Sequence, residues 1–128
     1  MNRPVLLDSS FLVALDRETR TREIGPARRY LPALRGRQLV VSVVTVAELL
    51  EGASDPEATA ASLQRFAIQG IHLAHAHRCA LMQRRSSRRL SENDAWLVAT
   101  AEALDAEVVG RDRRAFERFG SRYRRFDG

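Results

Sequence analysis

Short apolar runs alternate with helical patterns along the first half of the chain. Residues 4–7 form an apolar run that ends in Asp8, and a strongly apolar stretch follows over residues 11–15. This order predicts a buried strand, then a carboxylate, then a helix. Residues 39–44 are almost all aliphatic and predict a second buried strand, followed by a helix over residues 45–53. The chain therefore opens with two strand-to-helix units.

The second half continues the alternation. Asp55 and Pro56 predict the start of a helix that Gly70 ends, and Ser91 predicts the cap of another helix. Further helices are predicted over residues 27–34, 75–90, 92–105 and 113–119, and further strands over residues 71–74, 107–109 and 123–126. Strands that alternate with helices through short connections predict an α/β fold, with a central parallel sheet covered by helices on both faces.

The composition is that of an ordinary globular protein. With 128 residues, of which 45% are hydrophobic, we expect a single domain over residues 1–128. No apolar run approaches the roughly 18 residues of a membrane span, and we expect a cytoplasmic protein. Cys79 is the only cysteine, which excludes an internal disulfide and a cysteine-based structural zinc site.

All 21 basic residues are arginines, and the net charge is +5. The lack of lysine excludes a P-loop and Schiff-base chemistry, both of which need an amine. Genomic base composition is the favoured explanation for that lack. The positive balance itself favours a polyanionic partner.

Two acids are predicted at the same end of the sheet. Asp8 ends the first strand, and Asp112 lies two residues beyond Gly110, at the end of the fourth. In parallel sheets, ligands bind beyond the carboxyl ends of the strands. Each acid also has an ordinary alternative role, because Asp8 could cap the following helix and Asp112 could pair with a neighbouring arginine.

Two further acids lie on predicted helices. Asp94 continues the apolar stripe of Leu97 and Val98, where a charge is costly unless a cation or hydrogen bonds compensate it. The alternative is that Asp94 belongs to the first helical turn, where the helix dipole and Ser91 favour an acid. Glu48 falls away from the apolar stripe of its helix, and periodicity alone places it in solvent.

Four blocks of sequence carry a resemblance to a known family. They are VLLDSSFLVAL at residues 5–15, VSVVTVAELLEG at 41–52, LSENDAWLVATA at 90–101 and EVVGRD at 107–112. Together, in this order, they resemble the PIN domain family and, within it, the short ribonuclease toxins of the VapC type. The resemblance covers essentially the whole chain.

The resemblance implies a sheet in the order 3-2-1-4-5, a homodimer, and a cognate antitoxin protein that blocks the active site. The chain departs from the family pattern at Gly110, where many relatives carry threonine or serine. The hydroxyl missing at this position could come from Ser10 instead. The resemblance also implies a catalytic acidic pocket that binds Mg²⁺ or Mn²⁺, built from Asp8, Glu48, Asp94 and Asp112.

The function implied is metal-dependent endoribonuclease cleavage of tRNA, rRNA or mRNA. Divalent ions held by carboxylates can activate water and stabilise charge on phosphate oxygens. Because an acidic pocket repels RNA, arginines should surround it, although a solvated helix face is an equal interpretation of these residues. The alternative function is a non-catalytic PIN-fold module that binds RNA or an antitoxin. The candidate substrate-binding residues are Ser10, Arg84, Arg85, Arg88, Arg89, Arg111, Arg113 and Arg114.

Overall fold

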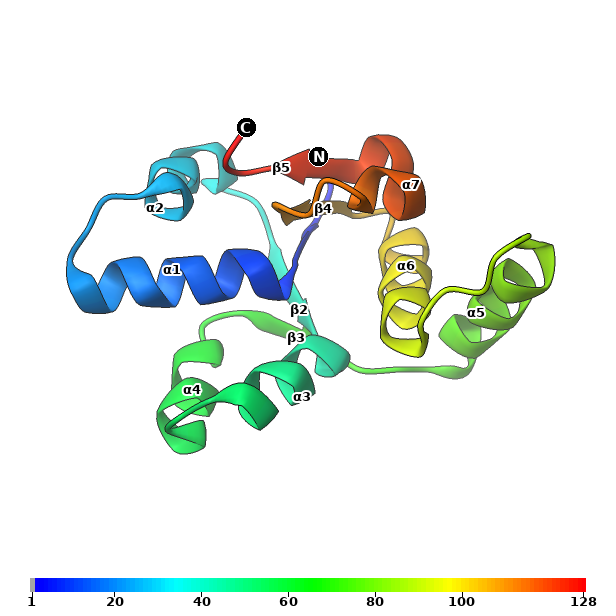
Figure 1. Cartoon of the computed structure of the whole chain (residues 1–128), viewed down its shortest axis with the longest axis horizontal. Coiled ribbons are helices and arrows are strands. Elements are labelled where there is room, and N and C mark those ends of the chain that lie inside the picture. The colour runs from blue at the N-terminus through cyan, green and yellow to red at the C-terminus, as the bar shows by residue number, and fades with distance from the viewer. Residues whose placement is uncertain (1) are drawn as a thin grey trace.

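A five-stranded parallel sheet forms the centre of the computed structural model, which describes residues 2–128 (Figure 1). The strand order is β3-β2-β1-β4-β5, so the predicted α/β class and sheet order are both confirmed. The elements in chain order are β1 (Val5–Leu7), α1 (Ser9–Thr21), α2 (Pro26–Tyr30), the 3-10 helix η1 (Leu31–Leu34), β2 (Leu39–Ser42), α3 (Val43–Gly52), α4 (Pro56–Leu63), β3 (Ala67–Gln69), α5 (Leu73–Arg85), α6 (Glu92–Leu104), β4 (Glu107–Gly110), α7 (Ala115–Phe119), the 3-10 helix η2 (Gly120–Arg122) and β5 (Tyr123–Arg125).

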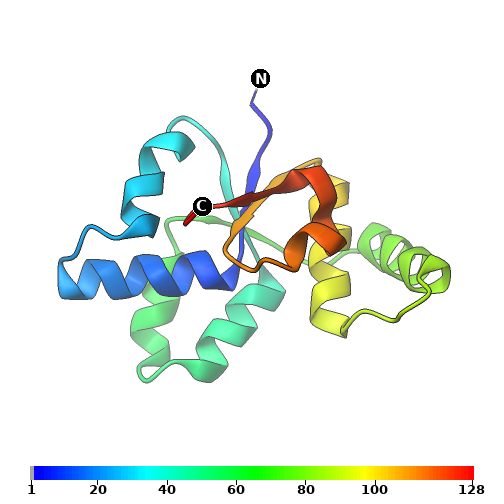
Figure 2. The ribbon, with the colours of Figure 1, turned by 45° about the horizontal axis from the view of Figure 1, so that its top comes forward.

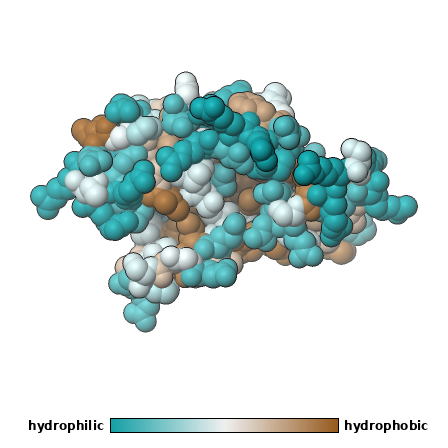
Figure 3. All heavy atoms as spheres, in the orientation of Figure 1, coloured by the Kyte–Doolittle hydropathy of each residue, from teal (hydrophilic) through white to brown (hydrophobic). Residues whose placement is uncertain are grey.

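Alternating side chains of the strands build a separate core on each face of the sheet. Val5 and Leu7 point to one face, where they pack with Phe11 of α1, and Leu6 points to the other, where it packs with Val98 of α6. The views in Figures 1 and 2 place α1 to α4 on one side of the sheet and α5 to α7 on the other. Hydrophilic side chains predominate on the surface drawn in Figure 3. Across residues 2–128, no helix has the length and apolar character needed to span a membrane.

The third strand does not lie where the sequence pattern predicts it. The helix after Asp55 ends at Leu63 rather than at Gly70, β3 occupies residues 67–69, and residues 71–74 contain no strand. β3 pairs only with β2, at the edge of the sheet, and its Ile68 is exposed. A short edge strand without a buried face leaves little periodic signal, which explains the error.

Capping side chains set the boundaries of the neighbouring helices. Ser42 Oγ accepts a hydrogen bond from Val44 N–H at 3.1 Å, so α3 begins two residues before the predicted start. His75 Nδ1 accepts from His72 N–H at 2.8 Å and caps α5, which starts within the segment predicted as strand. The predicted cap of α6 is confirmed, because Ser91 Oγ accepts from the N–H of Asp94 at 3.3 Å.

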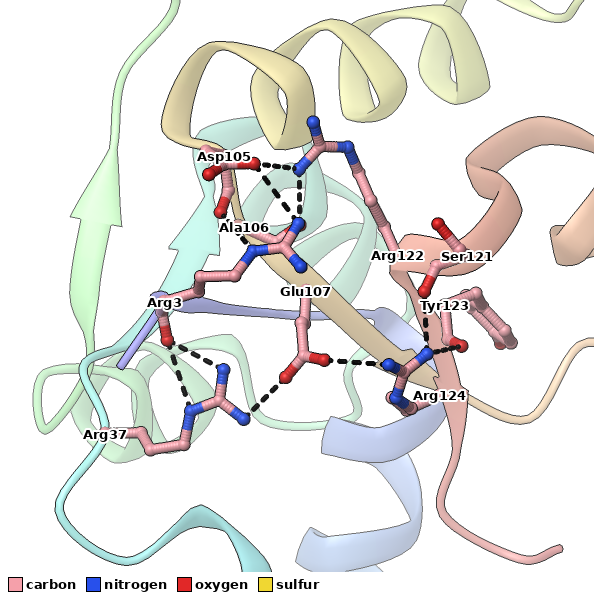
Figure 4. A network of polar contacts seen from close by, with 9 residues as sticks. All are labelled: Arg3, Arg37, Asp105, Ala106, Glu107, Ser121, Arg122, Tyr123 and Arg124. Carbon is pink, nitrogen blue, oxygen red and sulfur yellow. Dashed lines mark hydrogen bonds and ion pairs between the residues drawn. The ribbon is translucent and has the colours of Figure 1, made fainter. Parts of the chain in front are cut away.

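An ion-pair network joins the amino ends of the strands (Figure 4). The carboxylate of Glu107, the first residue of β4, lies 2.6 Å from the Arg37 guanidinium and 3.2 Å from that of Arg124. The network consists of Glu107 with Arg37 and Arg124, and of Asp105 with Arg3 and Arg122. Arginine therefore outnumbers carboxylate at this end of the sheet, opposite to Asp8.

A buried glutamate connects α1 to α2. The Glu18 carboxylate is only 3% exposed and accepts hydrogen bonds from the N–H groups of Ala27 and Arg28 at 3.0 and 2.9 Å. Burial alone would raise the pKa of Glu18, but these main-chain donors, with that of Gly25, hold it below its usual value of 4.5. A Cβ on Gly25 would stand 2.6 Å from the Glu18 carboxyl carbon, so the contact also needs glycine there.

Glu18→Gln should lower the free energy of unfolding by about 1–3 kcal/mol at pH 7, because one amide oxygen cannot replace both acceptors. Since the folded-state pKa of Glu18 is lowered, this stability is present above its unfolded pKa and is lost as pH falls through the folded value. Urea unfolding at pH 7 and pH 3 measures both effects. The matched control is Glu23→Gln on the exposed loop, with a change below about 0.5 kcal/mol. Equal losses in the two variants at pH 7 would contradict the role of Glu18.

Candidate active site at the carboxyl ends of the strands

Asp8 is the first residue beyond β1 and lies where the sequence predicts it. Its N–H donates to the carbonyl of Val109 in β4 at 2.9 Å, and its Oδ1 accepts from Ser9 N–H at 2.8 Å, so it also caps α1. Ser10 Oγ donates to Asp8 Oδ2 at 3.4 Å and accepts from the N–H of Arg111 at 3.1 Å. Asp8 therefore fills the cap role and the strand-end role together.

The charge of Asp8 is incompletely compensated. Burial raises the pKa of Asp8 above its usual 3.8, and the nearby charge of Asp112 raises it further. The hydrogen bond from Ser9, the Arg118 guanidinium and the Ser10 hydroxyl act in the opposite direction and do not prevail. The ionised form of Asp8 is thus held at a cost to the fold.

Glu48 lies on the exposed side of α3, as helical periodicity predicts. Partial burial of its carboxyl and the charge of Asp8 raise the pKa of Glu48, as does the charge of Asp94, while a hydrogen bond from the Asn93 side chain lowers it. Glu48 is therefore in electrostatic contact with acids from β1 and from α6. An exposed position on its own helix does not separate it from the site.

Arg118 of α7 joins the remaining two acids. Its Nη2 lies 2.8 Å from Asp112 Oδ2, and its Nε lies 3.7 Å from Asp94 Oδ2. The hydrogen bond from Arg118, with the N–H of Arg114, holds the pKa of Asp112 below its usual value. The Arg118 side chain is mostly buried, so its charge is not freely screened by solvent. The arginine of this site is thus one that the sequence interpretation did not include.

The position of Arg118 in the chain explains why it was missed. It follows Asp112 by six residues, a separation that brings side chains together only through the turn between β4 and α7. The one available signal is that Ala115 and Phe119, beside Arg118 on α7, are both buried. Arg118 therefore lies at the border of a packed face, which brings its side chain to the site.

The donor chemistry of the site suits a hard divalent ion, because all four acids offer oxygen ligands. Nevertheless, within residues 2–128 no three His, Cys, Asp or Glu side chains lie close enough together to hold a metal ion. The compact cage expected from the sequence is therefore not formed in this conformation. In this conformation Arg118 provides the positive charge beside Asp94 and Asp112.

The candidate substrate-binding arginines form two groups. Arg111 stacks its guanidinium 5.8 Å from the ring centre of Phe126, and Arg114 contributes its main-chain N–H to Asp112, while the Arg113 side chain is exposed. A second group is exposed at the end of α5 and in the connection to α6, with no ion-pair partner in the described part of the chain: Arg84, Arg85, Arg88 and Arg89.

Fold and site together define an α/β protein with acids gathered beyond the carboxyl ends of a parallel sheet. The sequence pattern of the PIN domain family matches residues 5–121, and the chain belongs to this family. No curated protein matches the chain.

Solved structures with the same fold include toxin–antitoxin complexes. A complex from Klebsiella pneumoniae shares 24% identity over 94% of this chain and 95% of its own, with a TM-score of 0.73. VapBC-1 from nontypeable Haemophilus influenzae shares 19% identity over 97% of this chain and 98% of its own, with a TM-score of 0.71. DNA-bound VapBC from Salmonella typhimurium shares 18% identity over 98% of this chain and 99% of its own, with a TM-score of 0.72. Likeness at these identities establishes the shared fold.

Asp8→Asn should stabilise the metal-free protein at pH 7 by up to about 1 kcal/mol, because asparagine keeps the cap and removes a poorly compensated charge. Since the folded-state pKa of Asp8 is raised, the cost of its ionised form disappears as pH falls through that value, and the gain should vanish near pH 3. Thermal unfolding in EDTA measures the gain. The control is Asp16→Asn on the exposed face of α1, which breaks a 3.0 Å pair with Arg20 and should cost less than about 0.5 kcal/mol. A destabilised Asp8→Asn protein would contradict this account.

Proposed function

We propose that the chain is a metal-dependent endoribonuclease of the cytoplasm and the toxin of a toxin–antitoxin pair. Membership of the PIN domain family and the fold shared with toxin–antitoxin complexes support this proposal. The observation that carries it is geometric: Asp8 and Asp112 follow the paired strands β1 and β4, and Arg118 joins Asp112 to Asp94 of α6. Such an arrangement serves a bound cation better than it serves the stability of the fold.

In the proposed mechanism, Asp8 and Asp94 hold the principal Mg²⁺ or Mn²⁺, and Glu48 and Asp112 complete the ligand set or orient the attacking water. The bound ion would activate that water and neutralise charge on the phosphate oxygens. Glu48 has a raised pKa and an exposed position, both of which suit it to accept a proton. Arg118, once released by Asp112, can donate to a phosphate oxygen.

Arginines around the acidic site would draw the RNA backbone towards it. Because each guanidinium that contacts a phosphate releases counterions, the contribution of these residues should depend strongly on salt. Arg88 and Arg89 are the strongest candidates, since both are exposed in the connection that leads into α6, the helix of Asp94.

The proposed antitoxin would cover the groove beside Glu48. This groove, of about 450 Å³, lies between α1, α3 and α4, and Leu12, Val13 and Phe66 give it an apolar floor. An apolar segment seated there would also block access to Glu48. For the proposed homodimer, the edge strand β3 and the residues after it offer the exposed apolar side chains of Ile68, Ile71 and Leu73.

A second candidate is a non-catalytic module whose acidic site grips an arginine of its partner. The contact of Arg118 with Asp94 and Asp112 favours this candidate, because the pocket already holds one guanidinium. Such a module would bind RNA or an antitoxin without a divalent ion, so its binding would be indifferent to a chelator.

Asp8→Asn and Asp94→Asn should each reduce cleavage of a structured RNA by at least about a hundredfold in Mg²⁺, because each removes a metal ligand. The measurement is single-turnover cleavage in Mg²⁺, in Mn²⁺ and in EDTA, which should abolish it. Asp16→Asn, which removes an exposed acid of α1, is the matched control and should retain wild-type rates. Full metal-dependent cleavage by Asp8→Asn would refute the proposed mechanism, and RNA binding unaffected by EDTA without cleavage would favour the non-catalytic module.

Replacing Arg88 and Arg89 together by glutamine should weaken RNA binding at low salt. The slope of log affinity against log salt should fall by about 2, because each arginine would neutralise one phosphate. Fluorescence anisotropy with a labelled RNA at several salt concentrations measures this slope. The control is Arg17→Gln with Arg22→Gln, two exposed arginines of α1 and its C-cap. An unchanged slope in the first pair would assign these arginines to a solvated surface.

A further inference from the structure

Gly110 ends β4, and its lack of a side chain lets the Tyr123 hydroxyl and the Asp8 carboxylate approach its Cα closely. A Cβ on Gly110 would collide with Tyr123 Oη and would stand 2.8 Å from Asp8 Oδ2. The backbone of Gly110 is not in the left-handed region, so glycine is needed here for room and not for its torsion angles. The Tyr123 hydroxyl and the Asp8 carboxylate therefore border the same gap, on the face of the sheet end where the acids gather.

Tyr123 is held rigidly in this position. It is fully buried in β5. Its ring stacks on that of Phe119, with 5.8 Å between the ring centres, and lies edge-on to that of Phe116, with 5.1 Å between the centres. The Tyr123 hydroxyl oxygen accepts a hydrogen bond from the N–H of Asp112 at 2.9 Å. Burial, together with the charges of Asp8 and Asp112, raises the pKa of Tyr123 to about 12, so the hydroxyl keeps its proton at neutral pH.

We propose that Tyr123 is a positioning residue of the carboxylate site, whose hydroxyl fills the gap at Gly110, fixes the main chain of Asp112 and lies beside Asp8. The hydroxyl beside Gly110 thus comes from β5, the neighbour of β4 in the sheet. Glycine and tyrosine then form an interdependent pair, because a side chain at residue 110 and a hydroxyl on residue 123 cannot occupy the same space. The link to catalysis rests on the proposed nuclease function.

Tyr123→Phe should weaken Mn²⁺ binding about tenfold, because Asp112 loses the hydrogen bond that orients it. Titration calorimetry with Mn²⁺ in the absence of RNA measures the affinity, and amide hydrogen exchange at Asp112 should become at least about tenfold faster as its N–H loses an acceptor. Tyr30→Phe removes the other tyrosine hydroxyl of the chain, on α2, and should change neither quantity.

The decisive variant is the double substitution. Gly110→Ser alone should also weaken Mn²⁺ binding, because its Cβ meets the Tyr123 hydroxyl. Gly110→Ser combined with Tyr123→Phe removes the clash with the Tyr123 hydroxyl and keeps one hydroxyl at the site, while the approach to Asp8 Oδ2 at 2.8 Å remains. Its Mn²⁺ affinity should therefore exceed that of Gly110→Ser alone, whereas a purely structural role would make the two losses add.

Additive losses in the double variant, Tyr123→Phe binding as tight as wild type, or no Mn²⁺ binding by any form would each overturn the inference. A wild-type protein that binds Mn²⁺ in a Tyr123-dependent way but cleaves no RNA would overturn the proposed function alone.

Discussion

Repulsion among carboxylates at one end of a parallel sheet is the constraint on which the rest of this structure depends. β1 and β4 are hydrogen-bonded neighbours, so Asp8 and Asp112 leave the sheet close together. Asp112 is well compensated by Arg118 and has a lowered pKa, whereas Asp8 depends mainly on a single main-chain donor and has a raised one. The fold therefore leaves the charge of Asp8 poorly compensated and neutralises that of Asp112. The position of α7 brings Arg118 to Asp112 for this purpose.

Much of the fold follows from local sequence signals. Aliphatic runs located the buried strands β1, β2 and β4, and Ser91 located the start of α6. The errors fall where tertiary structure decides. β3 is an edge strand with an exposed face, so its sequence lacks the alternation that a half-buried strand shows, and the apolar Ile71 that suggested a strand is itself exposed.

The candidate site was predictable only in part, for a related reason. Asp8 and Asp112 follow strands whose parallel pairing brings them together, so strand order alone predicts their proximity. Glu48 interacts with Asp8 and Asp94 through the approach of α3 to the site, which no helical stripe records. Arg118 and the Tyr123 hydroxyl act through contacts that exist only after α7 and β5 have packed, and neither residue stands out in the sequence.

The arginine network at the amino ends of the strands contrasts in charge with the acidic site at their carboxyl ends. Four arginines pair with two carboxylates at one end of the sheet, whereas at the other end Arg118 pairs with Asp94 and Asp112, and Asp8 and Glu48 have no ion-pair partner among residues 2–128. The strands thus run from an end where every carboxylate of the network is paired to an end where two acids are unpaired. In the metal-free protein these two unpaired acids repel the phosphates of a polyanion that approaches the carboxyl ends of the strands. Cation binding at that end would weaken this repulsion, and the same ion that serves chemistry would thereby open the acidic end to a nucleic acid.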